Sequence, residues 1–380
     1  MVLTAREAKT PLAICGGGTK ADIGRPFQSE ATLSARALTG ITLYEPSELV
    51  IAARAGTPLA EVEKALEEKG QRLPFEPADY RALLGSTGEP TIGAIAAANI
   101  SGPRRIMAGA ARDGLIGVRF VNGRGEIIKN GGRVMKNVTG LDLVKLMAGS
   151  WGTLGFLTEV TFKVLPTPET SATLLYSGLD DHRAIEALSE ALGSPFEVTG
   201  AVHIPVGEGY QTAQTLVRIE GFKTSVRYRI RELTRVLEDF GSPAVLEGHA
   251  GDALWRGLRD AAPLTTLPET AIWRISCAPS RGAELAASIR GAISGRHFFD
   301  WGGGLIWIAT ETGGAAAEAV RNATRTHGGH ATLIRAPIEM RTAFDVFEPL
   351  SEPLMRISRD IKASFDPDGI FNPGRMYAGV

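Results

Sequence analysis

Two patterns of apolar and polar positions divide the chain near residue 165. Before it, short apolar runs are separated by turns rich in glycine and proline, which is typical of short strands. Strands are expected at residues 41–44, 49–54, 118–121, 126–129 and 156–165. The third and fourth of these flank Asn122-Gly123-Arg124-Gly125, a sequence that favours a hairpin turn.

One clear helix is expected within this first part, directly after Thr57. We predict that Thr57 caps the helix and that Pro58 takes its first position, since a threonine oxygen can satisfy a free N–H group and proline lacks one. Leu59, Val62 and Leu66 recur at helical spacing, so the helix is expected to be amphipathic.

From residue 171 the pattern changes to a regular alternation of strands and amphipathic helices. Asp180 or Asp181 is expected to begin one helix, and Asp252 to cap another. Further strands are predicted at 201–204, 216–220, 272–277, 298–301 and 305–309, and further helices at 224–240, 283–292 and 315–326. This alternation predicts an α+β domain with helices on one face of a largely antiparallel sheet.

The breaks between these patterns suggest the domain organisation. Pro166 and Pro168 mark the first boundary. An amphipathic helix over 353–365 is followed by an irregular stretch whose density of Gly, Pro, Asp and Asn exceeds what a plain chain end requires. The predicted domains are residues 1–168, residues 169–340 and a C-terminal segment, residues 341–380.

The stretch Leu12 to Lys20, LAICGGGTK, carries the first candidate chemistry. Three glycines after an apolar run can turn successive N–H groups into one concavity that suits phosphate oxygens. The spacing of a Walker loop is absent, and the residues after the loop are too poor in helix formers for a dinucleotide fingerprint. If the stretch is more than an ordinary glycine turn, it binds phosphate as an extended loop.

A second candidate is the run Thr91 to Asn99, a helix of small residues followed by Arg104, Arg105 and Arg112. Small side chains let a helix lie close to another backbone or to a flat ligand, although a tightly packed core helix has the same composition. Guanidinium groups suit phosphate or carboxylate, but surface arginines are common, so each one is weak evidence by itself.

Composition excludes several classes of function. A formal net charge of −1 does not favour a nucleic-acid partner. Two cysteines, Cys15 and Cys277, cannot ligate an iron–sulfur cluster or a cysteine zinc site. His327 and His330 do not share a helix face, so we predict no metal site. Without a signal peptide core or an apolar run of membrane length, a cytoplasmic protein is expected.

Taken together, the segments over residues 12–165 resemble the flavoproteins related to vanillyl-alcohol oxidase, which have a PCMH-type FAD-binding domain. More narrowly, three motifs are similar to those of the FAD-binding subunits of bacterial glycolate oxidases. They are GPRR at Gly102–Arg105, the run Gly131–Gly155 and FDPDGIFNPGR at Phe365–Arg375. The resemblance implies an FAD domain of two α/β subdomains, an α+β cap domain, and a C-terminal segment that returns to the FAD domain.

The resemblance also implies a set of residues that bind FAD. It places the pyrophosphate on the glycine loop, other residues along the cofactor, Arg112 near the phosphates and Asn372 near the isoalloxazine ring. The implied residues are Cys15, Gly16, Gly17, Gly18, Thr19, Lys20, Thr91, Ile92, Gly93, Asn99, Gly102, Arg112 and Asn372. No histidine precedes His182, so the covalent attachment through a loop histidine found in some relatives is unavailable, and non-covalent FAD is expected.

Three features depart from the family pattern. Ala94 stands where a second glycine is usual, and Leu141 replaces an expected tyrosine. The glycine loop also lies close to residue 1, which leaves little room for the strand and helix that normally precede it. Each departure is expected to weaken contacts with FAD.

The function implied is oxidation of glycolate, or of a similar 2-hydroxy acid such as D-lactate, with electrons passed to a partner subunit. The motif H-x-G-D-G-N of related catalytic subunits is absent, and His330 and Arg335 are the only weak catalytic candidates. The resemblance therefore implies a catalytic flavoprotein partner and an iron–sulfur partner, through which the complex could sit at the inner membrane. The alternatives are a stand-alone FAD-dependent alcohol or sugar-lactone oxidase, or a non-catalytic assembly subunit.

Overall fold

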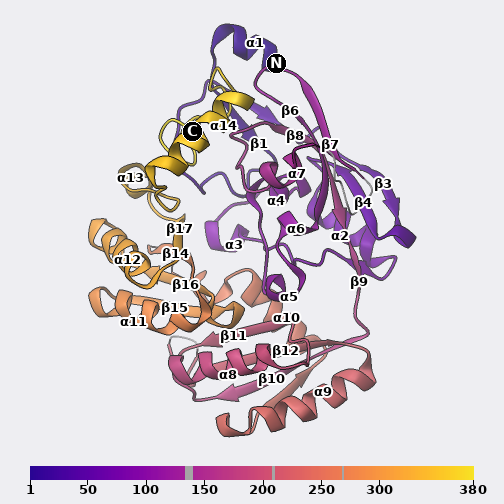
Figure 1. Cartoon of the computed structure of the whole chain (residues 1–380), viewed down its shortest axis with the longest axis vertical. Helices are drawn as coiled ribbons and strands as arrows, with labels where there is room; N and C mark the ends of the chain where they lie inside the picture. Colours follow the sequence, from indigo (N-terminus) through magenta and orange to yellow (C-terminus); the bar gives the residue numbers. More distant parts are fainter. Residues whose placement is uncertain (133–139, 208–209, 268) are drawn as a thin grey trace. The chain divides into compact units, whose positions relative to one another are not determined.

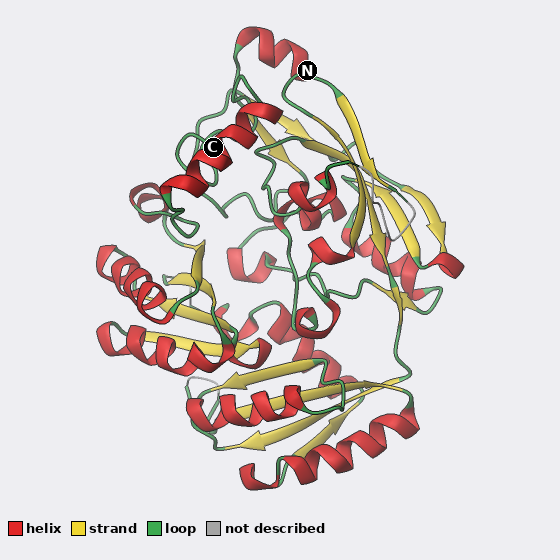
Figure 2. Cartoon of the chain, viewed as in Figure 1, coloured by secondary structure: helices red, strands yellow, loops and turns green. Residues whose placement is uncertain are grey.

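The computed structural model describes residues 1–132, 140–207, 210–267 and 269–380 (Figure 1). By their internal contacts these residues form two compact units, and both combine helices with strands (Figure 2). The first unit comprises Met1–Ser101, Gly109–Thr167 and Asp345–Val380, and the second comprises Gly102–Ala108 and Pro168–Phe344. The fold is therefore α+β, as predicted.

The short segment Gly102–Ala108 belongs to the second unit, although the sequence places it within the first predicted domain. Arg104 forms an ion pair with Glu220, and both side chains are buried. The Arg105 guanidinium lies 4.5 Å from the ring centroid of Trp301. These contacts explain why the segment packs with residues far along the chain.

An antiparallel sheet in the order β3-β4-β8-β6-β7 organises the first unit. Its strands are β3 (Ile41–Glu45), β4 (Val50–Arg54), β6 (Leu115–Val121), β7 (Ile127–Gly131) and β8 (Phe156–Lys163). The predicted hairpin joins β6 to β7, and the Asn122 side-chain oxygen closes its turn by accepting the N–H groups of Arg124 and Glu126, both at 3.0 Å.

The helix predicted after Thr57 is α2 (Leu59–Glu67), and it buries Leu59, Val62 and Leu66 as expected. The predicted cap is wrong, because Pro58 is the N-cap residue and no side chain caps the helix. The Thr57 hydroxyl is instead 2.7 Å from the Arg54 carbonyl oxygen, to which it donates, and it accepts from the Gly40 N–H at 3.0 Å.

A second, smaller sheet joins the two ends of the chain within the first unit. Strands β1 (Leu12–Cys15) and β2 (Ala31–Ser34) are parallel, and Phe371 forms a parallel bridge with Leu12. A core of Ala5, Leu12, Ile370 and Phe371 fixes this junction. The other elements of the unit are α1 (Val2–Ala8), β5 (Gln71–Arg72), α3 (Arg81–Leu84), α4 (Ile92–Ala98), α6 (Ala111–Gly114), α7 (Leu143–Met147), β9 (Leu165–Pro166) and α14 (Glu352–Phe365).

The second unit is built on an eight-stranded antiparallel sheet in the order β13-β10-β12-β11-β15-β16-β14-β17. The strands are β10 (Thr170–Ser177), β11 (Gly200–Ile204), β12 (Gln214–Gly221), β13 (Ala244–Glu247), β14 (Ala271–Ser276), β15 (Gly295–Asp300), β16 (Leu305–Thr310) and β17 (His330–Arg335). Short helices α5 (Arg105–Ala108) and α13 (Ile338–Ala343) complete the unit. The antiparallel sheet agrees with the sequence-based prediction.

Four helices cover one face of this sheet: α8 (Asp181–Gly193), α9 (Lys223–Val236), α11 (Gly282–Ala292) and α12 (Gly314–His327). The prediction of helices on one face only is wrong for α10 (His249–Arg259). Its Trp255 donates to the Thr173 hydroxyl at 2.8 Å, and Thr173 alternates with Leu174, which faces the core under α8 and α9. The predicted Asp252 cap is also wrong, because α10 begins earlier, after Gly248.

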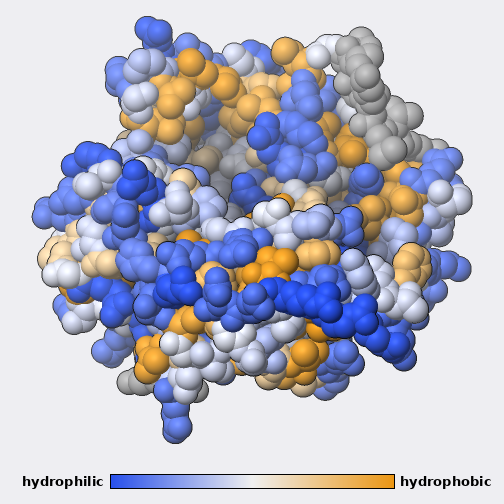
Figure 3. Space-filling view, turned by 60° about the horizontal axis from the view of Figure 1, so that its bottom comes forward, coloured by the Kyte–Doolittle hydropathy of each residue, from blue (hydrophilic) through white to orange (hydrophobic). Residues whose placement is uncertain are grey.

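The face of the molecule drawn in Figure 3 is largely polar. Hydrophilic residues cover most of the face drawn in Figure 3, and hydrophobic residues form small patches there. In α9, for example, Arg227, Arg231 and Arg235 are exposed. Within the part of the chain that the structure describes, no helix combines the length and apolar character needed to cross a membrane.

Candidate cofactor site

The glycine loop after β1 is held against other backbone segments of the first unit. A Cβ atom on Gly17 would lie 1.6 Å from the Glu89 carbonyl oxygen, and one on Gly88 would lie 1.8 Å from the Gly17 carbonyl oxygen. Gly18 has a φ of +84°, a conformation that favours glycine. The loop therefore needs glycine for close approach and not merely for flexibility.

The small-residue helix α4 packs beside this loop. It is one residue shorter at each end than predicted, because Thr91 and Asn99 are its N-cap and C-cap residues. Gly93 is required here, since a Cβ atom on it would lie 2.6 Å from atoms of Ala55. The Thr91 side chain is 3 % exposed, and its hydroxyl oxygen has no hydrogen-bond partner among the described residues. A Cβ atom on Gly16 would lie 2.4 Å from that oxygen. A buried hydroxyl with unmet hydrogen bonds is costly unless a ligand supplies the partner.

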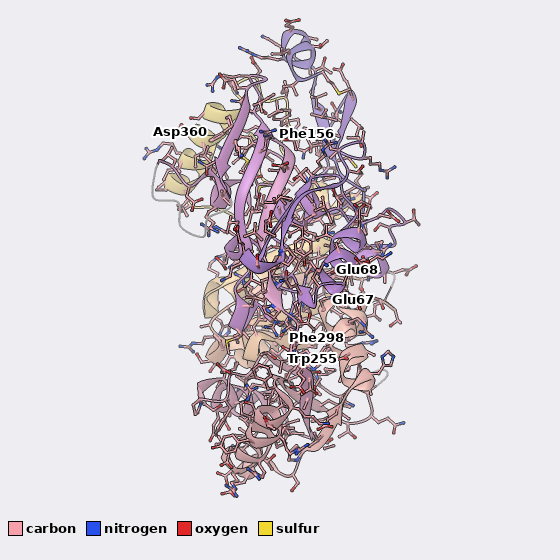
Figure 4. All side chains as sticks on the ribbon, turned by 90° about the vertical axis from the view of Figure 1, so that its right-hand side faces the viewer. Glu67, Glu68, Phe156, Trp255, Phe298 and Asp360 are labelled. Carbon is pink, nitrogen blue, oxygen red and sulfur yellow. The ribbon has the colours of Figure 1, made fainter. Side chains whose placement is uncertain are left out.

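A cavity of about 300 Å³ opens between the loop and α4. One wall is the glycine loop, a second is formed by Ala94, Ala97 and Ala98 of α4, and a third is the turn from Trp151 to Leu157. This third wall includes Phe156, the first residue of β8 (Figure 4). Because the walls are alanine, glycine and aromatic rings, the cavity suits a flat ligand that needs few side-chain contacts.

A second cavity adjoins the first, so the two together have room for a ligand that is longer than the first cavity alone. This second cavity, of about 760 Å³, shares Gly18 and Thr91 with the first. Its walls include the stretch Gly85 to Glu89 and the side chain of Arg36, which donates to the Gly17 carbonyl oxygen at 3.1 Å.

Two basic side chains line the first cavity, and its described lining contains no carboxylate. Lys20 is 6 % exposed, and burial lowers its pKa to about 8, even though the Asp79 carboxylate opposes this shift. Arg375 donates to the carbonyl oxygens of Lys20 and Ile23 and lies 5.4 Å from the Trp151 ring centroid. The electrostatic character of the cavity therefore favours an anion.

The C-terminal segment positions two of these walls. Asn372 is fully buried with a φ of +41°, and its side-chain oxygen accepts the Ile14 N–H at 2.8 Å. Its amide nitrogen donates to the Trp151 carbonyl oxygen, also at 2.8 Å. Both ends of the Asn372 side chain thus bind protein, and the residue connects β1 to the turn at Trp151.

Sequence reasoning missed a second link of this kind, the buried pair Lys362 and Asp366. The Lys362 ammonium donates to the carbonyl oxygens of Thr153 and Phe371 and to the Asp366 carboxylate, at 2.7 to 2.8 Å. Burial lowers the pKa of Lys362, and the Asp366 charge opposes that shift. The spacing of four residues at the end of a predicted helix was the available signal.

Several residues predicted to bind the cofactor do not line the cavity. Ile92 is buried, and its N–H donates to the Thr57 carbonyl oxygen. Asn99 ends α4 and accepts the Arg112 N–H at 2.9 Å, while the Arg112 side chain is exposed. Gly102 lies in the second unit, where its carbonyl oxygen accepts from the Trp301 indole at 3.2 Å.

Other predicted residues do line the cavity. Cys15, Gly16, Gly18, Thr19, Lys20, Thr91 and Gly93 are all in its walls, together with Ala94, the residue that replaces a usual glycine. Gly17 lines the adjoining cavity. Leu141, the other substituted position, is 79 % exposed, and residues 133–139 of the motif Gly131–Gly155 lie outside the described residues.

The structure does not bring the two catalytic candidates together. His330 is exposed at the first position of β17, whereas Arg335 is at its last position. The Arg335 guanidinium donates to the Leu267 carbonyl oxygen and to the Thr270 hydroxyl. Neither residue lines either of the two cavities described above.

A buried cluster in the second unit was not predicted. The Asp181 carboxylate lies 2.9 Å from His297 Nε2 and 3.3 Å from His203 Nε2, and His203 Nδ1 lies 2.9 Å from the Thr215 hydroxyl. Burial would raise the pKa of Asp181, but the two histidines outweigh this effect and hold it well below its usual range. No sequence spacing connects residues so far apart. Among the described residues, no group of three His, Cys, Asp or Glu side chains is placed to hold a metal ion.

Comparison with protein families gives two matches, at opposite ends of the chain. Residues 1–131 match the family described as FAD binding domain, and residues 346–376 match the C-terminal domain of FAD linked oxidases. Both segments contribute to the first unit, and together they contain the glycine loop, α4 and Asn372.

Several curated proteins are similar to the chain. Glycolate oxidase subunit GlcE of Escherichia coli (strain K12) is 38 % identical over 97 % of this chain and 93 % of its own length. Glycolate oxidase subunit GlcD of Bacillus subtilis (strain 168) is 30 % identical over 57 % of this chain and 43 % of its own. D-lactate dehydrogenase of Anaerostipes hadrus is 34 % identical over 36 % of this chain and 28 % of its own length.

Solved structures share the fold at low sequence identity. An alkyldihydroxyacetonephosphate synthase has a TM-score of 0.68 at 17 % identity, covering 98 % of this chain and 74 % of its own. A 4-ethylphenol oxidase from Gulosibacter chungangensis has a TM-score of 0.68 at 15 % identity, covering 99 % and 87 %. At such identities the likeness concerns the fold alone.

Proposed function

Because this chain belongs to the family of glycolate oxidase subunit GlcE, we propose that it is the FAD-binding subunit of a complex that oxidises glycolate or a similar 2-hydroxy acid. It is an FAD-dependent oxidoreductase of the class that acts on CH–OH groups. D-lactate is a further substrate of the same chemistry, since it differs from glycolate by one methyl group on the reacting carbon.

The residues of the first unit fit FAD. The observation that carries this fit is the cavity itself, with two basic side chains, no described carboxylate in its lining and an unpaired Thr91 hydroxyl. We propose that Gly16, Gly17, Gly18 and Thr19 bind the phosphates through backbone N–H groups, which have no competing side chains there. Non-covalent binding is consistent with the sequence, which has no histidine before His182.

When bound, FAD would supply the redox chemistry, by taking up electrons that are removed from the hydroxyl-bearing carbon of the substrate. The chain supplies the shape and the electrostatics of the site. Trp151, Phe156 and the alanines of α4 would shield a bound ligand from water. Asn372 and Lys362 hold the backbone of two walls in place. We propose that Asn99 supports the site by accepting the Arg112 N–H, which ties the end of α4 to α6. Gly102 stays a prediction from the resemblance.

We also propose that a second flavoprotein, similar to GlcD, and an iron–sulfur subunit complete the enzyme. Three observations support this. The motif H-x-G-D-G-N is absent, two cysteines cannot ligate a cluster, and His330 and Arg335 are at opposite ends of one strand. The complex would reside in the cytoplasm, or at the inner membrane through a partner subunit.

Absorbance spectroscopy of the purified chain tests this proposal. Flavin bands that remain after gel filtration are expected, and they should persist when glycolate or D-lactate is added anaerobically to the chain alone. Addition of a GlcD-like partner should then allow the substrate to bleach them. A chain that binds no FAD would refute the proposed function, and bleaching without a partner would favour a stand-alone oxidase.

A further inference from the structure

Lys20 differs in its surroundings from the other lysines that the structure describes. It lines the cavity of the first unit, it is 6 % exposed, and its ammonium makes one hydrogen bond among the described residues, to the Thr19 hydroxyl at 3.3 Å. An ammonium group has three donors, and burying such a charge without partners is costly. An anion in the cavity would therefore stabilise the Lys20 ammonium.

The neighbouring charges are bound to other groups. Asp79 is the nearest acidic group to influence Lys20, but its carboxylate is bound to the Arg81 guanidinium at 2.6 Å. Arg375, the other base in the lining, donates to the Lys20 and Ile23 carbonyl oxygens. Of the two basic side chains in the lining, Lys20 therefore makes fewer hydrogen bonds to the described residues than Arg375 does.

We propose that the Lys20 ammonium forms the charge pair with a phosphate of FAD, and that deprotonation of this one lysine releases the cofactor at alkaline pH. The inference rests on the proposed FAD binding and adds its regulation. Lys20 directly follows the loop Gly16–Thr19, whose backbone N–H groups are proposed to bind the same phosphates. A flexible ammonium beside a glycine loop is a common arrangement for a phosphate-binding point charge.

The direction of the pH effect follows from linkage. Burial lowers the pKa of Lys20 to about 8 in the protein without ligand, and a phosphate beside it would raise that pKa. Below about pH 8 the lysine is protonated in both states, so affinity is constant. Above it, binding requires uptake of one proton, and the dissociation constant should rise about tenfold for each pH unit.

The experiment measures FAD binding by quenching of flavin fluorescence between about pH 6.5 and pH 9.5. The wild-type chain should show the alkaline slope. Lys20→Met should bind FAD about 10- to 100-fold more weakly at pH 7 and show no slope. Lys20→Arg should also lack the slope, since arginine keeps its charge over this range.

The matched control is Lys69→Met, which removes an exposed lysine from the same unit and should retain the wild-type slope. Thermal melting of each variant without FAD separates loss of fold from loss of charge. If the wild-type chain binds FAD without an alkaline slope, or if Lys20→Met keeps it, the inference about Lys20 is wrong while FAD binding stands. If no variant binds FAD at any pH, the proposed function itself fails.

Discussion

Replacing Gly17 by alanine tests whether the glycine loop is the cofactor site. The added Cβ atom would lie 1.6 Å from the Glu89 carbonyl oxygen, whereas real Cβ contacts stay beyond 3.0 Å. The added Cβ atom would thus be about 1.4 Å too close, and because its neighbour is a backbone oxygen, the loop or the segment Gly88–Glu89 must move. The loop and the segment Gly88–Glu89 both line the second cavity, of about 760 Å³.

The size of the effect follows from that displacement. Misplacing a binding group by about 1 Å costs on the order of 100-fold in function, and we expect a similar loss of FAD affinity. Overpacking of this kind also costs about 1–3 kcal/mol of stability, which a domain of ordinary stability survives. Gly17→Ala should therefore fold, melt somewhat earlier and elute without flavin bands.

The assay compares FAD titration and thermal melting of Gly17→Ala with those of Gly132→Ala. Gly132 lies in the same unit, and a Cβ atom on it would meet nothing within 4 Å. Gly132→Ala should retain FAD. If Gly17→Ala binds FAD as tightly as the wild-type chain, the loop does not hold the cofactor closely, and our reading of the site is wrong.

Three further substitutions probe other parts of the molecule. Asp181→Asn should destabilise the second unit by about 2–4 kcal/mol. Because folding lowers the pKa of Asp181, the difference between variant and wild type in the free energy of urea unfolding should be full above about pH 5 and shrink as the pH falls. A difference that grows in acid would contradict this assignment. Lys362→Met should cost about 3–5 kcal/mol in thermal or urea unfolding, because it leaves the Asp366 carboxylate buried without its cation; an unchanged melting temperature would show that the pair is not structural. Thr91→Val should leave the stability of the FAD-free chain unchanged or slightly higher, since the hydroxyl has no hydrogen-bond partner among the described residues, yet weaken FAD binding about tenfold; equal affinity would remove Thr91 from the site.

The local elements of the fold were predictable because local sequence determines them. The hairpin around Asn122–Gly125 depends on an asparagine that bonds its own turn, and α4 depends on a run of small residues. Errors arose where a long-range partner competed with a local one. Thr57 accepts from the N–H of Gly40, 17 residues before it, and does not cap α2. Asp252 accepts from the hydroxyl of Ser171, 81 residues before it.

The site was predictable only to the extent that backbone made it. At Gly17 an added Cβ atom would lie 1.6 Å from a backbone oxygen, so no other residue fits there and the sequence must carry a glycine at this position. The Asp181 cluster has no comparable signal in the sequence, because its histidines come from β11 and β15 and meet only when the sheet forms. Sequence reasoning therefore identifies the loop and overlooks the buried charges.

The C-terminal segment shows why the two ends of the chain form one site. Asn372 accepts from Ile14 and donates to Trp151, which lie more than 200 residues before it. Lys362 reaches Thr153 in the same way. The glycine loop and the turn at Trp151 would otherwise be two flexible, glycine-rich segments with few side chains to anchor them. The resemblance places Asn372 near the isoalloxazine ring, and its contacts give it a structural role as well, because they fix the distance between two cavity walls.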